Sequence, residues 1–173
     1  MEQSYISNDI FEQIKDFDRR NLSEEQKLSI DKLILNKELK QRYKHRGLCT
    51  GCKQPNTDFN WCQPCNSKRF QQNFKNWTSG NSDVDKLIQK SQLNAKTMWE
   101  KLEWIEYDRI ENIEYITKGG FGKVYKANWK DGYLTKLDYK TNQWDRYGSK
   151  MVALKCLNNS KDITLEFLKE VIF

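Results

Sequence analysis

Four of the five cysteines fall within one short stretch, CTGCKQPNTDFNWCQPC, with the spacing C-x2-C-x9-C-x2-C. Each C-x2-C pair can turn two thiolates toward one tetrahedral ion, and the loop between the pairs is short enough to limit the entropy cost of closure. We therefore expect a structural Zn²⁺ site. Four reduced cysteines without a metal are the alternative. The proposed ligands are Cys49, Cys52, Cys62 and Cys65.

The same stretch is rich in turn-forming residues, among them Gly51, Pro55 and Pro64, and it offers few apolar side chains for a core. A structural zinc ion supplies about 10–16 kcal/mol of apparent binding free energy, enough to hold such a segment folded. Four thiolates also close the coordination shell, and the only histidine, His45, lies outside the stretch. A catalytic zinc is therefore not expected.

The composition argues against one large core. Only 37% of the 173 residues are apolar and 31% are charged, so two small apolar clusters joined by helices are expected. The net charge of +6 favours acidic partners such as nucleotides or RNA, although solvated lysines on helix faces explain it more simply.

The N-terminal stretch MEQSYISNDIFEQIKDF carries early acids and no apolar core of a signal peptide. No apolar run approaches the roughly 20 residues that a spanning helix needs. We therefore expect a cytoplasmic chain without a membrane partner, the nucleus remaining open, in which thiols stay reduced.

The hydrophobic pattern predicts an α+β fold, with helical residues 1–47, a cysteine knot with a short helix over 48–80, a connecting helix over 81–104, and strands with a final helix over 105–173. Ser23 and Gln26 form a capping box at the start of a helix that runs to Tyr43. This helix could also bind a protein partner. Its predicted apolar stripe is Leu28, Ile34 or Leu35, Leu39 and Tyr43. For the connecting helix we expect a capping pair, Ser82 and Asp85, and these apolar members: Leu87, Ile88, Leu93 and Trp99.

The cysteine spacing resembles the short nucleoporin-type zinc finger, including an asparagine, Asn56, between the two pairs. The central loop is one residue shorter here, and Trp61 precedes the third cysteine instead of the first. Those fingers bind single-stranded RNA or ubiquitin, so the resemblance implies a zinc-dependent binding module. Basic and aromatic side chains of the kind that stack on bases follow it, although packing of a short helix on the knot is favoured. They are Lys68, Arg69, Phe70, Phe74, Lys75 and Trp77.

A second motif is ITKGGFGKVYKA, a glycine-rich turn between two strands. Glycines such as Gly119 and Gly122 let backbone N–H groups approach phosphate oxygens closely, while Phe121 could shield them from water. Downstream, the apolar strand MVALKCL contains one lysine, Lys155, which we expect to be buried and to need an anion. The helix ITLEFLKEVIF then places Glu166 and Glu170 on one face, either of which could pair with it.

These three elements, in this order from about residue 113 to 173, resemble a protein kinase N-lobe. With the cysteine motif C-x2-C…W-C-x2-C and the Trp-led stretch WIEYDRIENIEYI, the chain is similar to a large family of fungal tyrosine-kinase-like proteins. The resemblance implies ATP binding, with Lys155 on the α- and β-phosphates, Glu170 as its ion-pair partner and Ala153 in the adenine pocket. The remaining implied contacts are Ile116, Gly119, Gly120, Phe121, Gly122 and Val124.

The sequence departs from the kinase pattern in two places. Thr117 replaces the first loop glycine, and the connection NWKDGYLTKLDYKTNQWDRYGSKM is unusually long. Its Asp131-Gly132 pair and the alternation of Tyr133 to Tyr139 predict an extra hairpin, a flexible basic loop being the alternative.

Phosphotransfer also needs a catalytic base and carboxylates for magnesium. The only histidine precedes the glycine-rich turn, and TDFN at 57–60 lies inside the cysteine knot. We therefore expect a kinase-like fragment, truncated before the catalytic loop, that binds ATP weakly and does not transfer phosphate. The alternative function is the zinc-dependent module for single-stranded RNA or ubiquitin.

Overall fold

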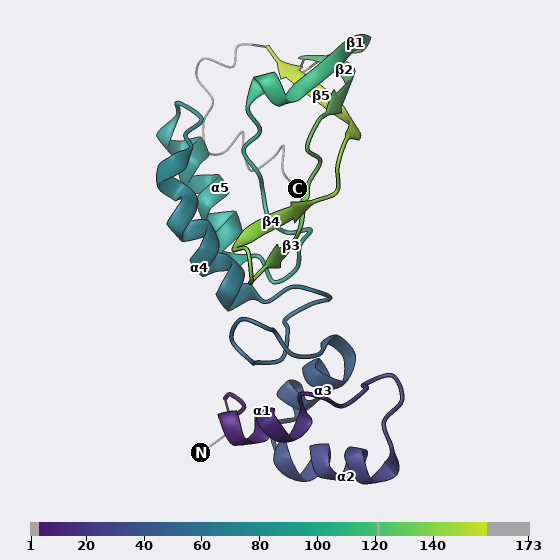
Figure 1. Ribbon diagram of the computed structural model, residues 1–173. Helices are drawn as coiled ribbons and strands as arrows, with labels where there is room; N and C mark the ends of the chain where they lie inside the picture. The colour runs from purple at the N-terminus through teal and green to yellow at the C-terminus, as the bar shows by residue number, and fades with distance from the viewer. Residues whose placement is uncertain (1–3, 121, 159–173) are drawn as a thin grey trace.

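The computed structural model describes residues 4–120 and 122–158. Within these ranges the chain combines five α-helices with two antiparallel sheets, so the expected α+β class is confirmed. In Figure 1 the N-terminal helices lie at one end, a helical layer beside a small hairpin lies in the middle, and the other sheet lies at the opposite end.

The three N-terminal helices enclose a core of their own. They are α1 (Asn8–Ile14), α2 (Glu24–Leu33) and α3 (Lys37–Arg46). The predicted capping box is present at α2, where Ser23 Oγ accepts from the Gln26 N–H and the Gln26 side chain accepts from the Ser23 N–H. The hydroxyl of Tyr43 donates to the Ile14 carbonyl at 2.9 Å. The buried members of the cluster are Ile6, Ile14, Ile30, Ile34, Leu39 and Tyr43.

The single helix expected from Ser23 to Tyr43 is in fact two helices. Ile34 leaves the helical conformation, and the Asn36 side chain accepts from the Leu39 N–H, which starts α3. Of the predicted stripe, Ile34, Leu39 and Tyr43 are buried, so the prediction is wrong only for Leu28 and for the alternative Leu35. Leu28 is 59% exposed and Leu35 is 75% exposed.

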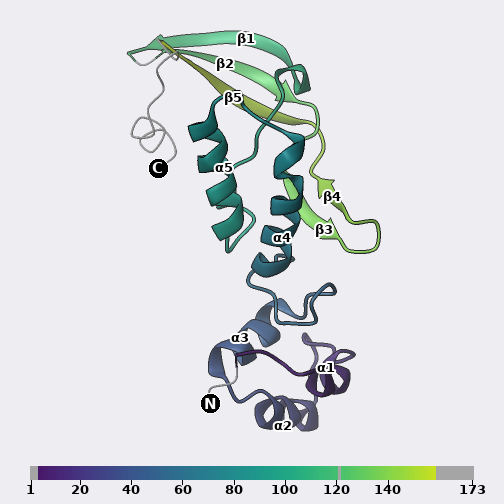
Figure 2. The ribbon, with the colours of Figure 1, turned by 90° about the vertical axis from the view of Figure 1, so that its left-hand side faces the viewer.

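The middle of the molecule contains α4 (Gln63–Asn73) and α5 (Ser82–Asn94), which lie side by side in both views (Figures 1 and 2). The cap of α5 is Asn81 and not Ser82, since the Asn81 side chain accepts from two N–H groups of the first turn. Asp85 binds the preceding loop instead, accepting from the backbone and hydroxyl of Ser79.

The helix predicted over 81–104 ends at Asn94. The following segment folds back on the last turn of α5. Ser91 Oγ accepts from the Leu102 N–H, and the Gln92 side-chain amide donates to the Leu102 carbonyl. Trp99 therefore lies outside the helix and is 70% exposed.

The larger sheet contains β1 (Ile110–Gly119), β2 (Gly122–Trp129) and β5 (Lys150–Leu157), all antiparallel in the order β1-β2-β5. Gly119 pairs with Gly122, so the glycine-rich motif forms the tight turn of the β1–β2 hairpin. Gly122 is needed for packing, because a Cβ there would collide with the Cys156 carbonyl of β5.

The extra hairpin predicted in the long connection is confirmed. It consists of β3 (Leu134–Asp138) and β4 (Gln143–Arg146), which form a separate two-stranded sheet. The Asp131-Gly132 pair lies at its base, where Gly132 has a φ of 63° and a Cβ would collide with the Gly148 carbonyl. Figure 2 shows this hairpin beside α4, reaching toward the cysteine segment.

Candidate functional site

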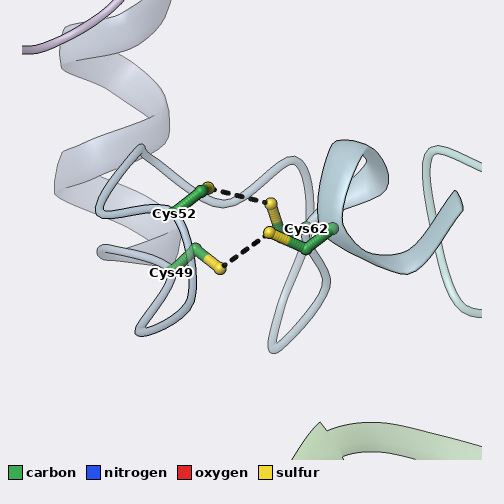
Figure 3. Close-up of side chains that lie close together, drawn as sticks. Cys49, Cys52 and Cys62 are labelled. Atoms are coloured by element: carbon green, nitrogen blue, oxygen red, sulfur yellow. Dashed lines mark hydrogen bonds between the residues drawn. The ribbon is translucent and has the colours of Figure 1, made fainter. Parts of the chain in front are cut away.

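The four predicted metal ligands converge on one point. Their Sγ atoms all lie within 4.8 Å of one another. The Cys49–Cys65 sulfur distance is 3.8 Å and the Cys52–Cys62 distance is 3.5 Å. Figure 3 shows the sulfur atoms of three of these cysteines pointing toward one another.

The sulfur separations fit a single tetrahedral ion. Four Zn–S bonds of about 2.3 Å place neighbouring sulfur atoms about 3.8 Å apart. A disulfide bond would need an S–S distance of about 2.05 Å, and none of the four cysteines forms one. The donor set is thus compatible with Zn²⁺, and four thiolates would close the coordination shell of such an ion.

The first cysteine pair is shaped by a tight backbone turn. The Lys53 N–H donates to the Cys49 carbonyl at 2.8 Å, and Lys53 adopts a left-handed φ of 62°. The Gln54 side chain then exchanges two hydrogen bonds with the backbone of Ile6, at 2.7 and 2.9 Å. These bonds attach the knot to the N-terminal helical cluster.

The second cysteine pair begins α4. Cys62 is the N-cap, Pro64 lies in the first turn, and Cys65 follows it. The first N–H groups of a helix have no intrahelical partner and carry partial positive charge, which favours a thiolate. The helix start thereby supplies two of the four candidate ligands.

The sulfur cluster cannot ionise freely without a cation. Hydrogen bonds from Cys52 and Cys62 lower the pKa of Cys49, whereas the hydrogen bonds with Cys49 and Cys52 raise the pKa of Cys62. Burial raises the pKa of Cys65 to about 12. Close like charges resist a second ionisation, and a divalent ion removes that resistance.

Tyr139, the residue directly after β3, contacts one of the cysteines, and the sequence pattern did not indicate this contact. Its hydroxyl lies 3.1 Å from Cys49 Sγ, although the two residues are far apart in the chain. A Cβ at Gly51 would collide with the Tyr139 ring, so a glycine at that position lets the ring approach the knot. Burial raises the pKa of Tyr139, and its hydroxyl keeps its proton.

Trp61 and Phe70, next to the knot, belong to a hydrophobic core. Trp61 and Phe70 are 0% and 4% exposed. Phe70 stacks on Trp144 of β4 with ring centroids 4.8 Å apart, and Trp61 Nε1 donates to the Ala95 carbonyl at 2.9 Å. For Phe70 the favoured interpretation, packing of the short helix, is therefore correct, and the alternative that its ring stacks on bases is not supported.

The residues proposed to contact ATP lie in the three-stranded sheet. Val124 pairs with Lys155 and Lys126 pairs with Ala153. Since cross-strand partners, and residues two apart on one strand, share a face, Val124, Ala153 and Lys155 lie on the same face. Ile116 is 56% exposed on β1.

Lys155 is exposed, which corrects the expectation of a buried cation. The physical reason is that β5 is an edge strand of a narrow sheet, so its side chains border solvent. Phe121, Glu166, Glu170 and the helix predicted over 163–173 lie outside the described residues. The pairing of Lys155 with Glu170 therefore stays a prediction.

No protein-family model, curated protein or solved structure matches this chain. Among the described helices, none combines the length and apolar character needed to span a bilayer.

Proposed function

We propose that the chain is a kinase-like, nucleotide-binding lobe attached to a zinc-stabilised helical module in a reducing compartment such as the cytoplasm. The observation that carries this proposal is the register of the sheet. It sets Val124, Ala153 and Lys155 on one face of strands that lead from the glycine-rich turn. An adenine would rest against the two small apolar side chains, and the ammonium of Lys155 would bind the phosphates.

The glycines of the turn give further support. Gly119 and Gly120 have nothing within 4 Å of the position where a Cβ would lie, and neither has a positive φ. Packing and backbone conformation among the described residues therefore do not require glycine at these positions. Close approach of a phosphate to the backbone would require glycine, because a side chain at either position would hold the phosphate away.

The alternative function, a zinc-dependent module for single-stranded RNA or ubiquitin, is less well supported. Its RNA form needs aromatic faces open to bases, and Trp61 and Phe70 are buried. Among the aromatic residues considered for this role, Phe74 and Trp77 are only partly exposed and pack edge to face with centroids 6.5 Å apart.

The proposal is tested by titrating Mg²⁺·ATP into the zinc-loaded chain and measuring the heat of binding. Lys155→Gln should weaken binding at least about tenfold, the loss of one charge-assisted contact. The matched control is Lys123→Gln, which removes an exposed charge from the opposite face of β2. No binding by the wild-type chain, or equal losses in both variants, would overturn the proposal.

A further inference from the structure

The β3–β4 hairpin contacts the cysteine knot and α4 at separate points. The Tyr139 hydroxyl lies 3.1 Å from Cys49 Sγ. Arg69 of α4 donates to the Asn142 carbonyl at 2.6 Å, and Trp144 stacks on Phe70. Only the first of these contacts involves a metal ligand.

We propose that Tyr139 is an outer-sphere residue of the metal centre, and that metal binding and docking of the hairpin form one coupled equilibrium. The inference rests on the cysteine cluster binding Zn²⁺. It goes beyond nucleotide binding and does not depend on it.

The coupling follows from the chemistry of the sulfur atom. A thiol is a weak hydrogen-bond acceptor, whereas a thiolate accepts a much stronger, charge-assisted bond. As a thiol, Cys49 Sγ donates to the Tyr139 oxygen at 3.1 Å. With zinc bound, Cys49 is held as a thiolate with no proton to donate, so the Tyr139 hydroxyl donates to it in a charge-assisted bond. Thermodynamic linkage then requires the docked hairpin to strengthen zinc binding by the same factor.

The position of the hairpin in the chain extends this coupling from the knot to the three-stranded sheet. The hairpin lies between β2 and β5 in the chain, so its base is connected directly to these two strands of the three-stranded sheet. The Gly148 N–H donates to the Asp131 carbonyl and the Tyr147 N–H to the Tyr133 carbonyl, both at 3.0 Å, which closes the base. Metal occupancy at residues 49–65 would therefore influence the segment that joins β2 to β5.

The first experiment measures Zn²⁺ affinity of the full chain by competition with a chromophoric chelator. Tyr139→Phe keeps the ring and removes only the hydroxyl, and we expect it to weaken zinc binding by about tenfold, in the range found for outer-sphere residues. Tyr147→Phe is the matched control, since it removes a hydroxyl from an exposed tyrosine at the base of the same hairpin. It should leave the affinity within about twofold.

The second experiment measures amide hydrogen exchange across residues 134–146 with and without Zn²⁺. In the wild-type chain zinc should slow exchange in the hairpin, and in Tyr139→Phe the slowing should be much smaller. Arg69→Ala loosens the hairpin without touching a sulfur atom, so coupling predicts that it also weakens zinc binding.

Several results would overturn the proposal. One is unchanged affinity in Tyr139→Phe, and another is an equal loss in Tyr147→Phe. A third is Arg69→Ala with faster hairpin exchange but normal zinc affinity. Failure of the wild-type chain to bind zinc would overturn both the metal centre and this coupling, whereas failure to bind ATP would leave them standing.

Discussion

The burial of Trp61 depends on residues that come from other elements of the fold. Trp61 stands directly before Cys62, its indole is fully buried, and the Lys101 ammonium lies 5.8 Å from the ring centroid. Sequence alone could not reveal this, because the partners that bury the ring, Phe70 and Trp144, come from other elements.

We therefore predict that Trp61→Ala acts through stability. Truncating a buried tryptophan costs about 3–5 kcal/mol of unfolding free energy, to be measured by urea denaturation of the zinc-loaded chain. Trp77→Ala is the control, because that ring is only partly buried, and its cost should be clearly smaller. A loss below about 1 kcal/mol for Trp61→Ala would contradict the packing described here.

At the scale of elements, the sequence predicted a feature correctly where the residues that form it are close together in the chain. The Ser23–Gln26 capping box and the β3–β4 alternation both involve neighbouring residues, and both predicted elements are present. The break at Ile34 and the end of α5 depend on packing and on hydrogen bonds to later segments. The same distinction holds at the site, where the spacing indicated the cysteines but nothing local indicated Tyr139.

The cap of α5 allows a direct test at this scale. Asn81→Ala removes the acceptor for the N–H groups of Asp83 and Val84, and should lower the unfolding free energy by about 1 kcal/mol. Ser82→Ala, one residue later, should change it by less than about 0.5 kcal/mol. Thermal denaturation followed by circular dichroism compares the two. A larger effect at Ser82 would restore the cap expected from the sequence.

At the scale of the whole molecule, the connecting segment after α5 contains a buried ion pair, and both of its members bind the backbone of the hairpin. The Lys101 ammonium lies 3.0 Å from a Glu103 carboxylate oxygen, with side chains 3% and 9% exposed. Lys101 also donates to the Leu134 carbonyl, and Glu103 accepts from the Leu134 N–H. Because each charge in this group has a partner, removing either side chain would leave an uncompensated buried charge beside β3.

The knot, α4, the connecting segment and the hairpin thus contact one another around the aromatic cluster, while the three-stranded sheet lies beyond them (Figure 2). The N-terminal helices reach this assembly through the knot, by the bonds between Gln54 and Ile6. The cysteine centre therefore stands where the helical end of the molecule meets the rest.

Zinc K-edge X-ray absorption of the purified full chain tests this account most directly. We predict one zinc ion per chain with four sulfur neighbours at about 2.3 Å, and loss of that four-sulfur shell in Cys49→Ser. A wild-type chain that contains no zinc, or holds it through oxygen and nitrogen ligands, would contradict the account.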